Sequence, residues 1–100
     1  MAAPESLKVV YSDIAHQQIF AAMIYIARQG YPDTALRFAD ALYEFGQSLR
    51  YFPEKYAICK RKPFAAKQLR CAPLEHYVFL YRVESRRIIV HAVIHSSRIK

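Results

Sequence analysis

The spacing of the apolar residues changes once along the chain, near Pro53, and this change limits the fold to two kinds of layer. Before Pro53, apolar residues recur every three or four positions, which is typical of amphipathic helices. After it, they form alternating runs with the two-residue period of β-strands. One hundred residues suffice for one hydrophobic core. The sequence therefore predicts one α+β domain over residues 7–100, in the order β-α-α-β-β-β, behind a flexible tail of residues 1–6.

The first helix is predicted to run from Ser12 to about Gln29. Ser12 is a suitable N-cap, and Asp13 places a negative charge near the positive end of the helix dipole. Gly30 then provides a stop signal. A second helix begins at once, so we expect two antiparallel helices joined by a tight turn.

The second helix is predicted to begin at Pro32, whose missing N–H is not needed in a first turn, and to end before Pro53. Gly46 weakens this helix by roughly 1 kcal/mol relative to alanine. An apolar stripe with the spacing 3, 4, 3, 4, 3 indicates the face that packs on the core: Ala35, Phe38, Leu42, Phe45, Leu49 and Phe52.

Four strands are predicted, over residues 7–11, 68–72, 76–83 and 88–95. The last is apolar on both faces apart from His91 and His95, which suggests a central position in the sheet. A separation of four residues would place these two histidines on one face, roughly 13 Å apart at about 3.3 Å per residue. They could not share a metal ion unaided, and no other metal or cofactor motif is found.

The charge of the chain is divided unevenly. Residues 1–54 carry four Lys or Arg against six Asp or Glu, a net charge of −2, whereas residues 55–100 carry eleven against two, a net charge of +9. Such asymmetry favours a nucleic acid, an acidic protein or a machine that handles nucleic acid as partner. The cations could track a phosphate backbone, or could be a solvated face: Lys60, Arg61, Lys62, Lys67, Arg70, Arg82, Arg86, Arg87, Arg98 and Lys100.

Several kinds of chemistry are disfavoured. Two glycines do not make a phosphate-binding loop, and no motif supports a serine or cysteine nucleophile. Cys59 and Cys71 are too few for a disulfide framework, and we interpret them as buried thiols. No apolar run is long enough to cross a membrane and no signal peptide is evident, so a cytoplasmic protein is expected.

The residues resemble the ParE/RelE superfamily of bacterial type II toxins, and the resemblance covers nearly the whole chain. No single piece decides it, but the order and spacing of the pieces match on a β-α-α-β-β-β pattern. The matching pieces are Val10-Tyr11-Ser12, Tyr25-Ile26, Leu49 with Phe52-Pro53, Leu69-Arg70, the run from Tyr77 to Val83, and Val93-Ile94-His95 followed by Arg98. The resemblance implies a helical hairpin packed on a small, mostly antiparallel sheet.

Two activities are known in this superfamily, and the fold alone does not separate them. RelE-like members are ribosome-dependent mRNA nucleases, whereas ParE-like members poison DNA gyrase. This chain has Val78 after Tyr77, where RelE-like nucleases would be expected to carry an active-site arginine, and no tyrosine follows His95. Both departures favour the ParE-like branch.

The resemblance therefore implies the toxin of a type II toxin-antitoxin, or plasmid stabilisation, system that inhibits gyrase by binding, without a cofactor. Arg70, Arg82, His95 and Arg98 are the predicted target-binding residues. An internal salt bridge is an equally good explanation of Arg70 and Arg82. The expected partner is a cognate antitoxin, ParD-like or other, in a hetero-oligomer.

Two alternatives stay open. One is a RelE-like, metal-independent endoribonuclease acting on mRNA at the ribosome, in which cations hold the phosphate and His95 is the general base. Its predicted catalytic set is Lys60, Arg61, Lys67, Arg70 and His95. The other is a toxin fold that has lost its activity and serves as an interaction module.

Overall fold

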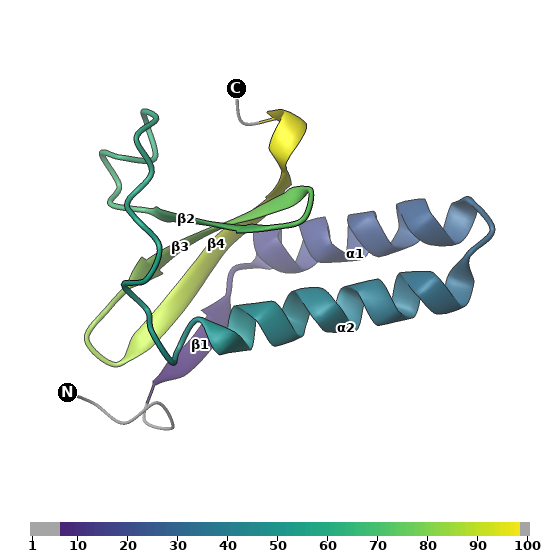
Figure 1. Cartoon of the computed structure of the whole chain (residues 1–100), viewed down its shortest axis with the longest axis horizontal. Helices are drawn as coiled ribbons and strands as arrows, with labels where there is room; N and C mark the ends of the chain where they lie inside the picture. Colours follow the sequence, from purple (N-terminus) through teal and green to yellow (C-terminus); the bar gives the residue numbers. More distant parts are fainter. Residues whose placement is uncertain (1–6, 99–100) are drawn as a thin grey trace.

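The computed structural model describes residues 7–98 and has the predicted order of elements (Figure 1). These are β1 (Lys8–Tyr11), α1 (Asp13–Arg28), α2 (Pro32–Ser48), β2 (Arg70–Leu74), β3 (Tyr77–Val83), β4 (Arg87–His95) and the short 3-10 helix η2 (Ser96–Arg98). The α+β class and the β-α-α-β-β-β order are thus confirmed. The tail predicted for residues 1–6 lies outside the described residues.

The sheet has the strand order β1-β4-β3-β2. β1 runs parallel to β4, and the other neighbours are antiparallel. The predicted central position of the last strand is confirmed, since β4 has β1 on one side and β3 on the other. β1 pairs only with residues Arg87–Val90, so the C-terminal half of β4 has no strand on that edge within the described chain.

The start of α1 is fixed by Ser12, as predicted. Its hydroxyl accepts the N–H of Ala15 at 3.0 Å and donates to the carbonyl of His91 at 2.7 Å. The cap therefore also joins α1 to the central strand. Gly30 has φ 95°, a left-handed conformation that glycine adopts without strain, and it makes the turn into α2. This turn projects away from the sheet (Figure 1).

The second helix is shorter than predicted. It ends at Ser48, because the next residues turn more tightly, with the N–H groups of Leu49 and Arg50 bonded only three residues back. Leu49 still reaches the core, but Phe52 is 74% exposed, so its assignment to the core stripe was wrong. Proline at position 53 also disfavours a helical conformation at Phe52.

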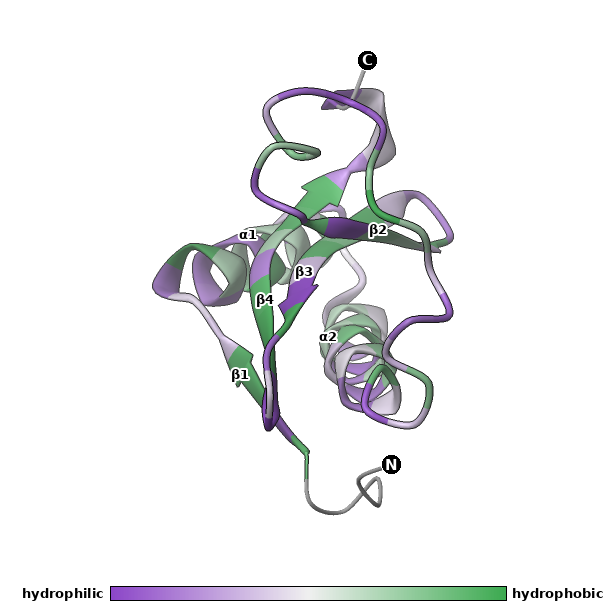
Figure 2. Ribbon diagram, turned by 90° about the vertical axis from the view of Figure 1, so that its left-hand side faces the viewer, coloured by the Kyte–Doolittle hydropathy of each residue, from purple (hydrophilic) through white to green (hydrophobic). Residues whose placement is uncertain are grey.

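Two apolar clusters lie on opposite faces of the sheet. The helices cover one face, where Ile19 and Leu42 pack with Phe79, Tyr81 and the inward residues of β4. The other cluster, which we call the second core, has Cys59, Leu69 and Leu80 at its centre, beneath the segment that connects α2 to β2. β4 serves both clusters and is largely apolar along its length (Figure 2). No helix within residues 7–98 is long and apolar enough to cross a membrane.

A β-bulge in β4 reverses the alternation of its side chains. Tyr81 pairs with Val90 and Leu80 with Ala92, so His91 is an extra residue without a partner in the register. Val90 and Val93 consequently share the helix-side core. The expectation that His91 and His95 share one face was therefore wrong, because His91 is the bulged residue and the alternation restarts after it.

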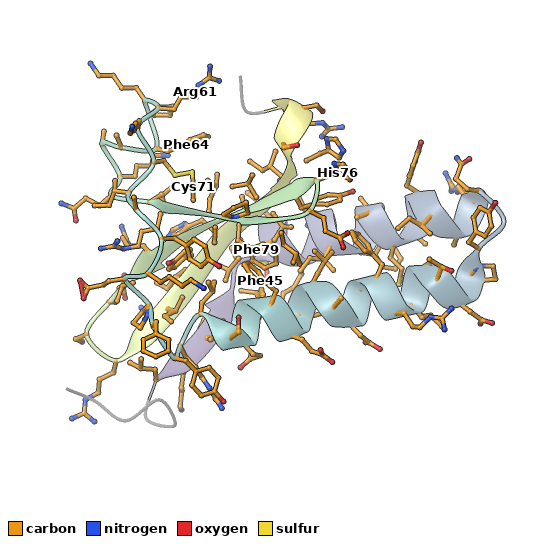
Figure 3. All side chains as sticks on the ribbon, viewed as in Figure 1. Phe45, Arg61, Phe64, Cys71, His76 and Phe79 are labelled. Atoms are coloured by element: carbon orange, nitrogen blue, oxygen red, sulfur yellow. A yellow bond between two sulfur atoms is a disulfide. The ribbon has the colours of Figure 1, made fainter. Side chains whose placement is uncertain are left out.

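The two cysteines form a disulfide, so their interpretation as free thiols was also wrong. Their Cα atoms lie 5.3 Å apart. Backbone hydrogen bonds bring the two residues together. The N–H of Cys59 donates to the carbonyl of Leu69 at 2.8 Å, and the N–H of Cys71 donates to the carbonyl of Ala57 at 3.3 Å. These bonds place both side chains in the second core, at the edge of the connecting segment (Figure 3).

Candidate functional site

A cavity of about 490 Å³ lies where the C-terminal end of β4 meets α1 and η2. We call it the end cavity. Its walls come from four elements, and its main side chains are Gln18, Tyr25, Tyr77, Val93, His95 and Arg98. The structure thus brings together His95 and Arg98, two of the four predicted target-binding residues.

His95 is held by aromatic and polar contacts on several sides. Its ring meets Tyr77 edge to face at 5.2 Å between centroids and stacks on His76 at 6.1 Å. The backbone N–H of Ser97 donates to its Nδ1 at 3.2 Å, and the Ser97 hydroxyl lies 2.8 Å from the same atom. An accepting Nδ1 leaves the proton of the neutral ring on Nε2. In this arrangement Nε2 is a hydrogen-bond donor.

Arg98 gives the end cavity its positive charge. Burial raises the pKa of the Tyr77 phenol, and the charge of Arg98 opposes this rise. The Arg98 residue is itself exposed on η2. The end cavity therefore combines an exposed cation with aromatic rings.

Arg70 lies elsewhere and has internal partners. It opens β2, opposite Tyr81, and its guanidinium donates to the carbonyl of Tyr56 at 2.7 Å. Glu54 lies 3.9 Å from it, and only 19% of the Arg70 side chain is exposed. The hydroxyl of Tyr81 donates to the carbonyl of Pro53 at 2.7 Å. Together these bonds fasten the chain after α2 to the sheet.

Arg82 is also in an internal pair. It donates to Glu84 at 2.8 Å, and Arg87 donates to the other carboxylate oxygen at 2.9 Å. Hydrogen bonds from Arg87 and Arg82 lower the pKa of Glu84. The internal salt bridge that the sequence allowed for Arg82 is thus present. The predicted roles of Arg70 and Arg82 in target binding stay predictions.

The nuclease set is not gathered at one place in the described residues. Lys60, Arg61 and Lys67 are exposed on the segment after α2, and none of them lines the end cavity with His95. Val78 packs in the second core. The structure thus divides the predicted cations among the end cavity, the Arg70 anchor, the Arg82 pair and the connecting segment.

Gln18 is a cavity residue that sequence reasoning missed. Its side-chain oxygen accepts the N–H of Val93 at 2.7 Å, a backbone group of β4 beyond the end of β1. The only signal was its position three residues after Ala15 and four before Ala22, which places it beside these buried residues on the helix. That spacing does not show which strand lies opposite.

The fold of this chain, a helical hairpin on a four-stranded sheet, is similar to that of a solved structure. The "Chromosomal ParDE TA system from P. aeruginosa" aligns with a TM-score of 0.75 and 15% identity, over 90% of this chain and 96% of that chain. At this identity the likeness shows the fold alone, that of a small α+β domain. A search of curated proteins finds no match.

The family follows from a direct sequence match. The family model described as "ParE toxin of type II toxin-antitoxin system, parDE" matches residues 9–100. The chain therefore belongs to the ParE toxin family. This confirms the branch that the sequence resembles.

Proposed function

We propose that this protein is a toxin that inhibits DNA gyrase through the end cavity and is neutralised by a cognate antitoxin. The observation that carries the proposal is the separation of its cations. Catalysis of RNA cleavage without a metal needs several preorganised charges around the reacting phosphate. In the described residues, Arg98 is the one cation that lines the cavity of His95. This arrangement favours binding over catalysis.

The chemistry of the end cavity suits a protein target. Tyr25 is 66% exposed at its rim, and Tyr77 and Arg98 lie within it. Tyrosine and arginine are the side chains that most often supply binding energy at protein interfaces. We propose that Arg98 pairs with an acidic group of gyrase while the aromatic rings pack against it.

The antitoxin has a surface available that begins at the rim of the end cavity and extends along α1. Within the described chain, the edge of β4 that pairs with β1 has no neighbouring strand beyond Val90, and Ile14 and Tyr25 are exposed along the same side of α1. An added strand, or an amphipathic segment laid along α1, would cover both features. Acidic side chains on such a segment would complement the basic second half of the chain.

Purified gyrase provides the first test. The protein should abolish DNA supercoiling and trap DNA breaks, and Arg98→Glu should prevent this. Arg37→Glu changes the charge equally at an exposed position of α2 and is the matched control. Circular dichroism should show that both variants fold. If Arg98→Glu inhibits gyrase as well as the control does, the end cavity is not the gyrase-binding surface.

Expression in cells separates the alternatives. Gyrase inhibition predicts growth arrest with intact messages, relieved by the antitoxin. Primer extension that shows cut messages, with gyrase unaffected, would instead support a ribosome-dependent endoribonuclease. Absence of growth arrest from a folded protein would support an inactive interaction module.

A further inference from the structure

The segment from Cys59 to Leu69, which we call the basic lobe, is a concentrated positive surface. Four cations are exposed within eight positions, and no Asp or Glu occurs between Lys55 and Leu74. Within residues 7–98, every carboxylate ion pair involves Arg70, Arg82 or Arg87. The lobe cations therefore have no carboxylate partners in this part of the chain: Lys60, Arg61, Lys62 and Lys67.

The basic lobe is built as a defined structure. The Cys59–Cys71 disulfide ties its start to β2. Inside the lobe, the N–H of Ala65 donates to the backbone carbonyl of Arg61 at 2.9 Å, and the N–H of Leu69 donates to that of Phe64 at 3.0 Å. Phe64 packs into the second core, while Arg61 lies at the outer end of the lobe (Figure 3). Cations held on an ordered scaffold lose less conformational entropy when they bind.

Lys67 of the basic lobe lies close enough to the sheet to influence His91. Burial lowers the pKa of His91, and the charges of Arg82 and then Lys67 lower it further. Lys67 of the lobe and Arg82 of β3 thus both act on His91.

We propose that the basic lobe binds the phosphate backbone of duplex DNA directly, at a site separate from the end cavity. Closely spaced lysines and arginines without competing carboxylates match a backbone with one charge per roughly 1.7 Å of helix axis. The alternatives fit less well. Single-strand binding relies on exposed aromatic platforms, and the one aromatic ring of the lobe, Phe64, is half-buried in the second core. A protein interface would also call for exposed aromatic or apolar anchors.

The proposed DNA binding does not require gyrase, so the test is done without gyrase. Binding to a fluorescent duplex of about two helical turns is measured by anisotropy over a range of salt concentrations. The variant Lys60→Gln/Arg61→Gln/Lys62→Gln is compared with Lys8→Gln/Arg28→Gln/Arg37→Gln, which removes the same charge from exposed positions on β1 and the helices. A urea titration checks that both are folded.

The lobe variant should bind at least tenfold more weakly at low salt. Its slope of log K against log salt should be shallower by about 0.9 for each phosphate that the variant no longer neutralises. The control should keep the slope of the wild type. Equal weakening in both variants would mean that net charge alone attracts DNA and would overturn the assignment, as would no binding to the duplex. Tighter binding to the single strand of the same sequence would overturn the choice of duplex.

Discussion

The phenol ring of Tyr11, at the end of β1, packs directly on Gly46 in α2. A Cβ added at Gly46 would lie 2.9 Å from Cζ of Tyr11 and 3.2 Å from Cε2. The Tyr11 hydroxyl donates to the carbonyl of Tyr43 at 3.2 Å, which holds the ring against the helix. Glycine at this position therefore lets the edge strand and the second helix approach closely.

Gly46→Ala should destabilise the protein, although helix propensity alone would favour alanine by roughly 1 kcal/mol. Overpacking against the Tyr11 ring should dominate, with a net loss of about 1–3 kcal/mol in the free energy of unfolding, measured by urea denaturation. In a Tyr11→Phe background, which removes the nearest atom, the same substitution should cost less. Equal costs in both backgrounds would mean that Tyr11 is not the cause.

The order of the elements and the central strand could be predicted because hydrophobic period and turn residues are local signals. Ser12 caps α1, Gly30 makes the turn between the helices and Pro32 begins α2, each as predicted. The extent of the stripe in α2 was overestimated. Helical spacing continues through Phe52, but the chain leaves the helix after Ser48, and no local signal marks that point.

The candidate site was predicted less well, because it depends on contacts between distant segments. The pairing of Cys59 with Cys71 follows from backbone bonds between the connecting segment and β2. The bulge at His91 depends on the register between β3 and β4, and it decides which histidine reaches the end cavity. Single-sequence patterns do not contain this information.

The disulfide should contribute measurably to stability. It closes a loop with a sequence separation of 12, which corresponds to about 3 kcal/mol of lost entropy in the unfolded chain. Cys59→Ala/Cys71→Ala should lower the free energy of unfolding by roughly this amount in urea titrations. Dithiothreitol should lower the stability of the wild type and leave that of the variant unchanged. A wild type indifferent to reduction would contradict the prediction.

Stability should fall steeply at alkaline pH because of two buried phenols. Burial raises the pKa of Tyr11 and of Tyr81 to about 12 each, whereas a tyrosine in an unfolded chain ionises near pH 10. Between pH 10 and 12 the folded state holds protons that the unfolded state has lost, so the free energy of unfolding decreases as pH rises.

Tyr81→Phe tests this pH dependence. At neutral pH the variant should have a free energy of unfolding about 1 kcal/mol lower, because it lacks the hydrogen bond to the carbonyl of Pro53. Above pH 10 its free energy of unfolding should decline less steeply than that of the wild type. Urea midpoints between pH 8 and 11.5 measure both effects. Tyr31→Phe, at a 62% exposed position, is the control. The prediction fails if both variants decline as steeply as the wild type.

Substitutions of Arg70 and Arg98 should have different effects: the first should reduce stability, and the second should reduce target binding. Arg70→Ala removes the charged donor to the carbonyl of Tyr56, so it should cost about 1–3 kcal/mol in the free energy of unfolding. Arg98→Ala alters an exposed side chain, so stability should change by less than about 0.5 kcal/mol while gyrase inhibition falls. Both are measured on the same preparations, by urea titration and by supercoiling with folded protein at equal concentration. If Arg70→Ala keeps full stability but loses inhibition, Arg70 contacts the target instead of anchoring the chain after α2.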